Sequence, residues 1–371
     1  MIITRKLEIF VAENDKELRK NYYNTLYETI NTAVKVANFT ASHLFMMDNS
    51  IPYLSEEDRE KLTFLGCKGQ KATRQNAPYV AASEIFKGKV DMGMISAIQQ
   101  GVRKSYQEDR KKGMWNKSLR SYKSNMPVPF GANRFLQFGF REYADQDGVC
   151  KNGCFFTLMG IPFQIKFGRD RSNNRSIVEN IIDGKYKMCT SSIKADGKKI
   201  FLLLCVDLPQ KNIELKENKI MTAFLDAYYP IVCTCEINAK QAYDSGIKVF
   251  QIGNKEEFLY RRIQIQEAVK RCQINNRYTK GGQGRKKKCQ AIDRYHEKEK
   301  KYVDTKLHTY SKMLVELAAK HKCAEIVLMN QKEKEDIAKE DQFLLRNWSY
   351  YGLKEKIAYK AQRYGIKLTV K

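Results

Sequence analysis

Apolar residues in the first third of the chain recur with two different periods. Residues 2–10 form a short, β-rich run that predicts one strand, whereas residues from about 14 to 123 follow a helical period. Further helical signals lie around residues 81–87 and 94–111. The apolar positions expected to form one stripe on the first helix are Leu18, Tyr22, Leu26, Ile30, Val34 and Ala37.

Between residues 127 and 209 the pattern changes to short apolar runs separated by glycine-containing turns. Three of these runs, residues 155–158, 163–167 and 200–206, are typical of strands. We therefore expect residues 1–13 and 126–211 to form one small β-domain, a barrel, with residues 14–125 as a helical insertion.

The last part of the chain, residues 212–371, shows a third pattern. A meander of strands precedes an alternation of helices and strands, which is the order of an RNase H-like fold. The expected strands are 220–225, 230–237, 248–252, 325–329 and 366–370, and the expected helices are 255–273, a second one following residues 279–288, and 353–364.

Composition adds a strong charge imbalance to this picture. The 371 residues include 67 Lys+Arg and 42 Asp+Glu, a net charge of +25, while 43% are hydrophobic. A folded chain with this excess is typical of a protein that binds a polyanion. The longest apolar run, residues 200–206, is too short to span a bilayer, and no apolar signal core precedes Glu8. We expect a cytoplasmic protein without a membrane partner.

The ten cysteines are irregularly spaced, which favours a reducing compartment over a disulfide framework. Cys150 and Cys154 form one close pair and Cys233 and Cys235 another, but neither has a second pair at zinc-ribbon spacing. Cys233 and Cys235 should share one face of a strand. Ordinary buried or half-exposed thiols are therefore expected, with no metal site and no cofactor.

Basic residues concentrate in the last domain. Residues 270–301 contain twelve Lys/Arg and three acidic residues, and glycines within residues 279–288 should let the backbone bend close to a phosphate. The spacing is not that of a P-loop. A solvated basic face is the alternative for any single member. The candidate nucleic-acid-binding residues here are Arg261, Arg262, Lys270, Arg271, Arg285, Lys286, Lys287 and Lys288.

A second basic patch lies in the helical insertion and is interleaved with aromatic residues. Cations can bind backbone phosphates while flat rings stack on exposed bases. The alternative is a helix with Tyr106 in the core and the stems of its lysines on the surface. The candidate residues of this patch are Arg103, Lys104, Arg110, Lys111, Trp115 and Arg120.

The last 160 residues resemble the RuvC region of TnpB-like nucleases and, more closely, the miniature type V-F CRISPR effectors. The matching stretches are residues 258–263, 281–288, 345–350, 354–357 and 363–367. The resemblance implies a wedge-type β-barrel with a helical recognition insertion, followed by a truncated RNase H-like (RuvC) domain. It also implies a guide RNA and a target double-stranded DNA as partners, and a second copy of the chain as a candidate partner.

The acidic positions of that family are altered in this sequence. The first family Asp aligns with Phe224, or with Asp226 if a two-residue gap is allowed, and the family Glu aligns with Met329. The third Asp lies beyond a zinc ribbon, which has no counterpart before Lys371. Two-metal cleavage requires several converging carboxylates, so the resemblance with these departures predicts a protein without nuclease activity.

Three functions are compatible with these features. The leading one is RNA-guided DNA binding without cleavage in transcription regulation, by blocking or by recruiting RNA polymerase or a sigma factor. The second is an active nuclease with a displaced acidic site formed by Asp226, Glu325 and Glu335. The third is a structural protein that binds a small RNA and never opens DNA.

Overall fold

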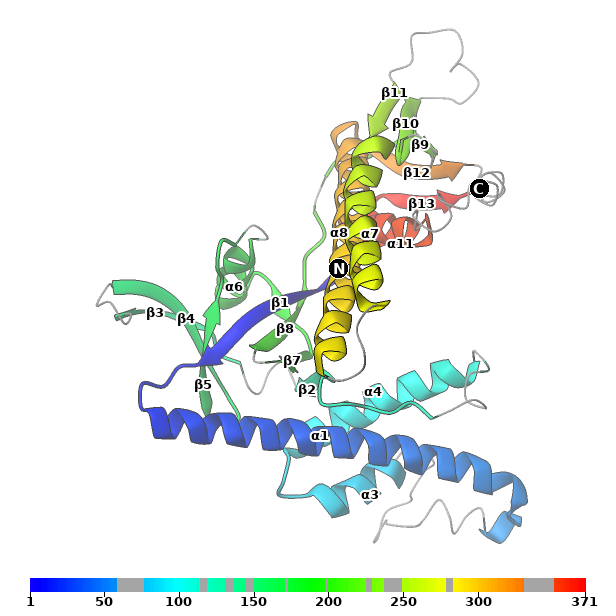
Figure 1. Ribbon diagram of the computed structural model, residues 1–371. Helices are drawn as coiled ribbons and strands as arrows, with labels where there is room; N and C mark the ends of the chain where they lie inside the picture. Colours follow the sequence, from blue (N-terminus) through cyan, green and yellow to red (C-terminus); the bar gives the residue numbers. More distant parts are fainter. Residues whose placement is uncertain are drawn as a thin grey trace. The chain divides into compact units, whose positions relative to one another are not determined.

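The computed structural model describes residues 1–58, 77–111, 113, 119–130, 136–144, 150–170, 173–197, 199–211, 213–224, 229–236, 249–277, 283–329 and 350–371. These residues form two compact units, Ile2–Leu208 and Pro209–Lys371, and Met1 groups with the second. Both units contain helices and sheets, as the sequence predicts, and each is described by itself (Figure 1). Within the described ranges, no helix is both long enough and apolar enough to cross a membrane.

The first unit is built on an eight-stranded sheet. Its order is β2-β7-β8-β1-β5-β4-β3, with β6 paired to β8. In the described part of the chain this path ends at β2 and β3, so closure into a barrel stays a prediction. The strands are β1 (Ile2–Val11), β2 (Val128–Phe130), β3 (Gly139–Ala144), β4 (Cys150–Leu158), β5 (Ile161–Lys166), β6 (Lys187–Met188), β7 (Ser191–Asp196) and β8 (Lys199–Asp207).

The amino-terminal strand β1 lies inside this sheet, between β5 and β8, and pairs antiparallel with both. Its side chains alternate: Leu7, Ile9 and Val11 are buried, whereas Lys6 and Phe10 are exposed. The sheet therefore has one apolar face and one face of mixed polarity. On the apolar side, Val178 of the short helix α6 (Asn174–Ile182) is fully buried.

Between β1 and β2 the chain forms helices α1 (Lys16–Ser50), α3 (Ala77–Phe86) and α4 (Met92–Lys111), with a 3₁₀ turn at Ile51–Tyr53. Asp15 caps α1, because its Oδ1 accepts hydrogen bonds from the backbone N–H groups of Glu17 (2.7 Å) and Leu18 (3.1 Å). The stripe predicted for α1 is wrong at its start. Leu18 is 49% exposed, and burial begins only at Leu26, where the helix starts to pack.

The second unit is built on a five-stranded sheet of order β11-β10-β9-β12-β13. β9, β10 and β11 form the expected antiparallel meander, and β12 and β13 add in parallel. The strands are β9 (Lys216–Phe224), β10 (Ile231–Glu236), β11 (Val249–Ile252), β12 (Cys323–Met329) and β13 (Lys367–Val370). The helices are α7 (Lys255–Arg277), α8 (Gln283–Lys320) and α11 (Tyr350–Tyr364).

One apolar core joins this sheet to its helices. Phe258 of α7, Leu314 of α8, Ile326 of β12 and Ile357 of α11 are all fully buried in it. Gly253 shows how closely the core is packed, because its φ is +82° and a Cβ there would approach Pro230 Cγ to 2.5 Å. Any side chain at this position would force the backbone and its neighbours apart.

The shared face predicted for Cys233 and Cys235 is confirmed. Cys233 is buried and Cys235 half-buried on the same face of β10. The Sγ atom of Cys235 lies 3.5 Å from that of Cys323. Burial raises the pKa of the Cys233 thiol to about 12. Among the described residues, no three His, Cys, Asp or Glu side chains gather closely enough to hold a metal ion.

Candidate nucleic-acid interface and the altered acidic positions

Phe224 and Met329, the two residues expected to replace family carboxylates, lie opposite each other in the second sheet. β9 and β12 pair in parallel, and their register places Met329 directly against Phe224. Residues paired across neighbouring strands project from the same face, with Cβ atoms about 5 Å apart. These two residues, far apart in sequence, therefore form one site at the carboxyl ends of both strands. A phenyl ring and a thioether stand there, and neither is a ligand for Mg²⁺.

Two alignments of the first family Asp are possible, one with Phe224 and one, with a two-residue gap, with Asp226. A carboxylate pair needs its members side by side, and the residue beside Met329 is Phe224. The register thus pairs the residue of the ungapped alignment with Met329, and the choice between the two alignments stays a prediction. Asp226, the candidate of the gapped alignment, and Glu335 of the displaced site lie outside the described residues.

Glu325, the remaining candidate of the displaced site, occupies the other half of β12. It lies four residues before Met329, which is about 13 Å along a strand. Its Oε1 accepts a hydrogen bond from the Thr369 hydroxyl and lies 4.0 Å from Lys367 Nζ. Glu325 is thus engaged with β13, away from the Phe224–Met329 pair.

The antiparallel pair of α7 and α8 presents many of the predicted cations. These basic residues lie on the parts of both helices that face solvent, while apolar residues such as Ile265 and Leu314 are buried. The exposed members are Arg261, Lys270, Arg271, Arg277, Arg294, Lys298, Lys300 and Lys301.

Arg262, by contrast, turns inward. Its side chain is only 9% exposed, and its Nη2 lies 2.7 Å from Oε1 of Glu299 on α8, to which its Nε also donates a hydrogen bond (2.9 Å). Gln266 donates a further hydrogen bond to the same oxygen (3.2 Å). This geometry gives Arg262 a role in holding α7 to α8, and its prediction as a nucleic-acid contact has no support from its position.

The described part of the glycine-containing segment begins at Gln283, and Gly281 and Gly282 lie outside the described residues. α8 begins at Gln283, so Gly284 and residues 285–288 belong to the first two turns of a helix rather than to a bent loop. Residues 285–288 thus lie at the positive end of the helix dipole, where an anion is favoured, and the first turn contains no acidic residue.

The basic patch of the helical insertion is anchored by carboxylates. Asp48 of α1 accepts hydrogen bonds from the Tyr106 hydroxyl (3.0 Å) and from Arg110, while Asp109 binds Arg120 through both of its oxygens (2.9 and 2.7 Å). The Asp109 hydrogen bond raises the pKa of Arg120. Tyr106 is buried, in line with the alternative interpretation of this patch.

Arg103 is half-buried and Lys104 and Lys111 are exposed along α4, whereas Trp115 lies outside the described residues. The segment after it is held in place by Asn38 of α1. The Asn38 side chain donates to the Tyr122 carbonyl (2.9 Å) and accepts from the Tyr122 N–H (2.8 Å). The backbone that carries Arg120 is therefore held two residues further on, at Tyr122. Local sequence patterns did not indicate this contact with Asn38.

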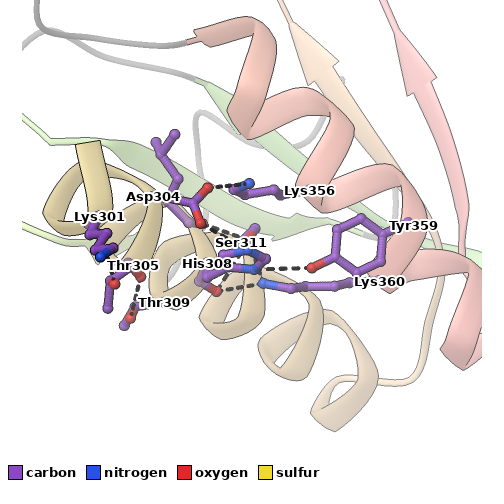
Figure 2. A network of polar contacts seen from close by, with 10 residues as sticks. Lys301, Asp304, Thr305, His308, Thr309, Ser311, Lys356, Tyr359 and Lys360 are labelled. Carbon is purple, nitrogen blue, oxygen red and sulfur yellow. Dashed lines mark hydrogen bonds and ion pairs between the residues drawn. The ribbon is translucent and has the colours of Figure 1, made fainter. Parts of the chain in front are cut away.

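A polar network fastens α11 to α8 (Figure 2). Lys356 pairs with Asp304 (2.7 Å), and the Tyr359 hydroxyl lies 3.0 Å from Nδ1 of His308. Lys360 donates to the carbonyl of His308 and to the Ser311 hydroxyl (2.7 Å). Burial, together with the charges of Lys356 and Lys312, lowers the pKa of Lys360 to about 8. This network supports the helix that carries the chain into β13.

Comparison by sequence and comparison by fold both find similarity to proteins of one name. The chain is 28% identical over 203 residues to the CRISPR-associated endodeoxyribonuclease Cas12f1 of Sulfoacidibacillus thermotolerans, covering 53% of this chain and 45% of that protein. It is 36% identical over 106 residues to Cas12f1 of Syntrophomonas palmitatica, covering 29% of this chain and 20% of that protein. The chain thus spans less than half the length of these curated relatives. No protein-family model matches.

Among solved structures, a cryo-EM structure of a Cas12f1–sgRNA–target DNA complex aligns with a TM-score of 0.68 at 14% identity, covering 100% of this chain and 89% of that one. The class defined by these findings is a mixed α/β protein with the Cas12f1 fold. The chain is a protein like the miniature type V-F CRISPR effectors, as the sequence predicts. Its relatives are named endonucleases, so they give no support to the expected absence of enzyme activity.

Proposed function

We propose that this chain is an RNA-guided, sequence-specific DNA-binding protein that does not cleave DNA. The observation that carries the proposal is the register of Phe224 with Met329 at the carboxyl ends of β9 and β12. Metal-assisted phosphodiester cleavage needs carboxylates that hold both ions, and at this site both side chains are apolar. The proposed domain roles are a wedge-type barrel with a helical recognition insertion and a RuvC-like second unit in which Phe224 and Met329 replace two catalytic acids.

The basic surfaces support the binding half of the proposal. Exposed cations follow α4, α7 and α8, and the chain carries a net charge of +25. Its relatives are Cas12f1 proteins, and the solved Cas12f1 structure contains an sgRNA and a target DNA. We therefore propose a guide RNA and a target duplex as partners, and base pairing as the source of sequence specificity.

Binding without cleavage leaves regulation of transcription as the proposed outcome, through blocking or through recruitment of RNA polymerase or a sigma factor. A second copy of the chain is a further candidate partner. These partners rest on the resemblance of the chain to type V-F effectors and stay predictions.

The test is a cleavage and binding assay with the intact chain, the RNA that co-purifies with it as guide, and a matched DNA duplex in Mg²⁺ or Mn²⁺. We expect guide-dependent binding with both strands intact. Met329→Glu should also leave them intact, because one added carboxylate does not complete a two-metal site. Strand scission by the unmodified chain that EDTA abolishes would favour the displaced acidic site instead. RNA binding without any duplex binding would favour the small-RNA-binding alternative.

A further inference from the structure

The sheet of the first unit has a second face, opposite α6, and many of its side chains reach solvent. α6 covers the side of β3 and β4 that carries Phe140 and Cys154, since the Arg175 guanidinium on α6 lies 5.1 Å from the Phe140 ring centre. Because strand residues alternate, Arg141 and Phe155 project from the opposite face. This face combines aromatic rings with cations at two places.

The first place is centred on a glycine. The Tyr143 and Phe155 rings meet edge to face at 5.7 Å, and the Arg141 guanidinium lies 4.0 Å from the Phe155 ring centre. A Cβ at Gly153 would come within 2.6 Å of the Gln164 amide nitrogen and within 2.9 Å of both rings. The absence of a side chain at Gly153 thus lets these groups pack together into one aromatic, cationic cluster.

The second place lies on β8 and β1. The ammonium group of Lys6 stands 3.8 Å from the centre of the Phe201 ring, and Phe201 is half-buried. Three strand spacings, about 14 Å, separate β8 from β4. The two aromatic–cation places are therefore laid out along one continuous surface of the sheet.

The charge of this face is predominantly positive. Two of its carboxylates lie near the aromatic–cation places and are already paired with lysines of the same face. Glu8 binds Lys199 (2.8 Å) and lies 3.9 Å from Lys166, and Asp196 lies 3.5 Å from Lys6. The described cations of this face are Lys6, Arg141, Lys166, Lys187, Lys194 and Lys199, and its described carboxylates are Glu8, Asp196 and Asp207.

We propose that this sheet face binds an unpaired segment of RNA, with the Phe155–Arg141 and Phe201–Lys6 places each receiving a base. A sheet that presents aromatic rings or guanidinium planes is suited to bases freed from a duplex, whereas the bases of a duplex are hidden. The inference rests on the proposed RNA-guided function and adds a base-stacking site to the phosphate-binding helices.

The experiment measures binding of a fluorescent single-stranded RNA, a hairpin RNA and a single-stranded DNA of the same sequence to the full chain. The test variant is Phe155→Leu with Phe201→Leu, which removes both rings but keeps apolar bulk. Tyr53→Leu, at a 90% exposed ring away from this face, is the matched control. Removal of each stacking ring should weaken single-strand binding by about fivefold or more, with hairpin binding and melting temperature unchanged and the control unaffected.

Equal single-strand affinity for the double variant and the intact chain would overturn this inference and leave the proposed function standing. Tighter binding of the DNA strand than of the RNA would also overturn it. An intact chain that binds no RNA would remove both proposals.

If the double variant unfolds, single-strand binding by the variants Arg141→Met and Lys6→Met tests the proposal instead, because both substitutions change exposed side chains. Photocrosslinks from 4-thiouridine RNA should then map to residues 139–158 and 199–207, and their absence there would refute the site.

Discussion

Lys360 is a residue whose surroundings clearly change its pKa. It is half-buried between α8 and α11, near Lys356 and Lys312, and its pKa falls to about 8 from the ordinary 10.5. Its two acceptors, the His308 carbonyl and the Ser311 hydroxyl, can be satisfied by a neutral amine as well as by an ammonium group. The folded state therefore tolerates the neutral form, whereas the unfolded chain keeps the proton up to a higher pH.

This difference predicts a pH dependence of stability. Between pH 8 and 10.5 the unfolded state binds more protons at this position than the folded state, so the free energy of unfolding contributed by Lys360 should rise with pH in that window. Lys360→Met should flatten the rise in urea midpoint between about pH 7.5 and pH 10. Lys306→Met, at a lysine of α8 that pairs with Glu257 of α7, serves as the control. An identical pH slope for the Lys360 variant and the intact chain would contradict the argument.

Two helices of the second unit are joined by an ion pair within their interface. Arg262 and Glu299 are 9% and 15% exposed, in contrast to the solvent-exposed Lys301–Glu297 pair nearby on α8. Removing one partner of a buried pair leaves the other charge without compensation, which costs far more than losing a surface pair.

Glu299→Ala should therefore lower the free energy of unfolding by about 3–5 kcal/mol. Glu297→Ala, the surface control, should change it by less than about 1 kcal/mol. Chemical denaturation of both variants at one pH measures the difference. The double variant Arg262→Met with Glu299→Leu should recover most of the loss, because it removes both charges. Comparable small effects of both single variants would show that solvent reaches the Arg262–Glu299 pair.

At the scale of the whole molecule, the net charge of +25 is the dominant property. Bound counterions are released from a nucleic acid when cations of a protein replace them, so affinity falls as salt rises. Residues 285–288 contribute four cations within the first turns of α8, at the end of the helix where the dipole also favours phosphate.

Replacing Arg285, Lys286, Lys287 and Lys288 together by Ala should weaken RNA binding and flatten the plot of log K against log salt. The expected change in slope is about 0.7–0.9 for each phosphate that the variant no longer binds. Binding titrations at several salt concentrations measure it, with Lys216→Ala at the start of β9 as a single-cation control. A slope equal to that of the intact chain would show that this cluster is only a solvated face.

Several features of this protein follow from local patterns alone. The strand at residues 2–10, the meander that begins the second unit, and the helices α4, α7 and α11 were predictable because the period of apolar residues reflects which face of an element is buried. That Phe224 and Met329 replace acidic residues is a prediction from the resemblance of the chain to a known family. Leu18 was misplaced because the period does not show how far along a helix its packing partners extend.

The long-range arrangement required the tertiary structure. That Phe224 lies beside Met329, that Arg262 turns inward to Glu299, and that Asn38 holds Tyr122 are all pairings between distant parts of the chain. Likewise, only strand register brings the rings around Gly153 together. Local periodicity specifies which side of an element is buried. It does not specify which other element covers that side, because this depends on how all the elements pack together.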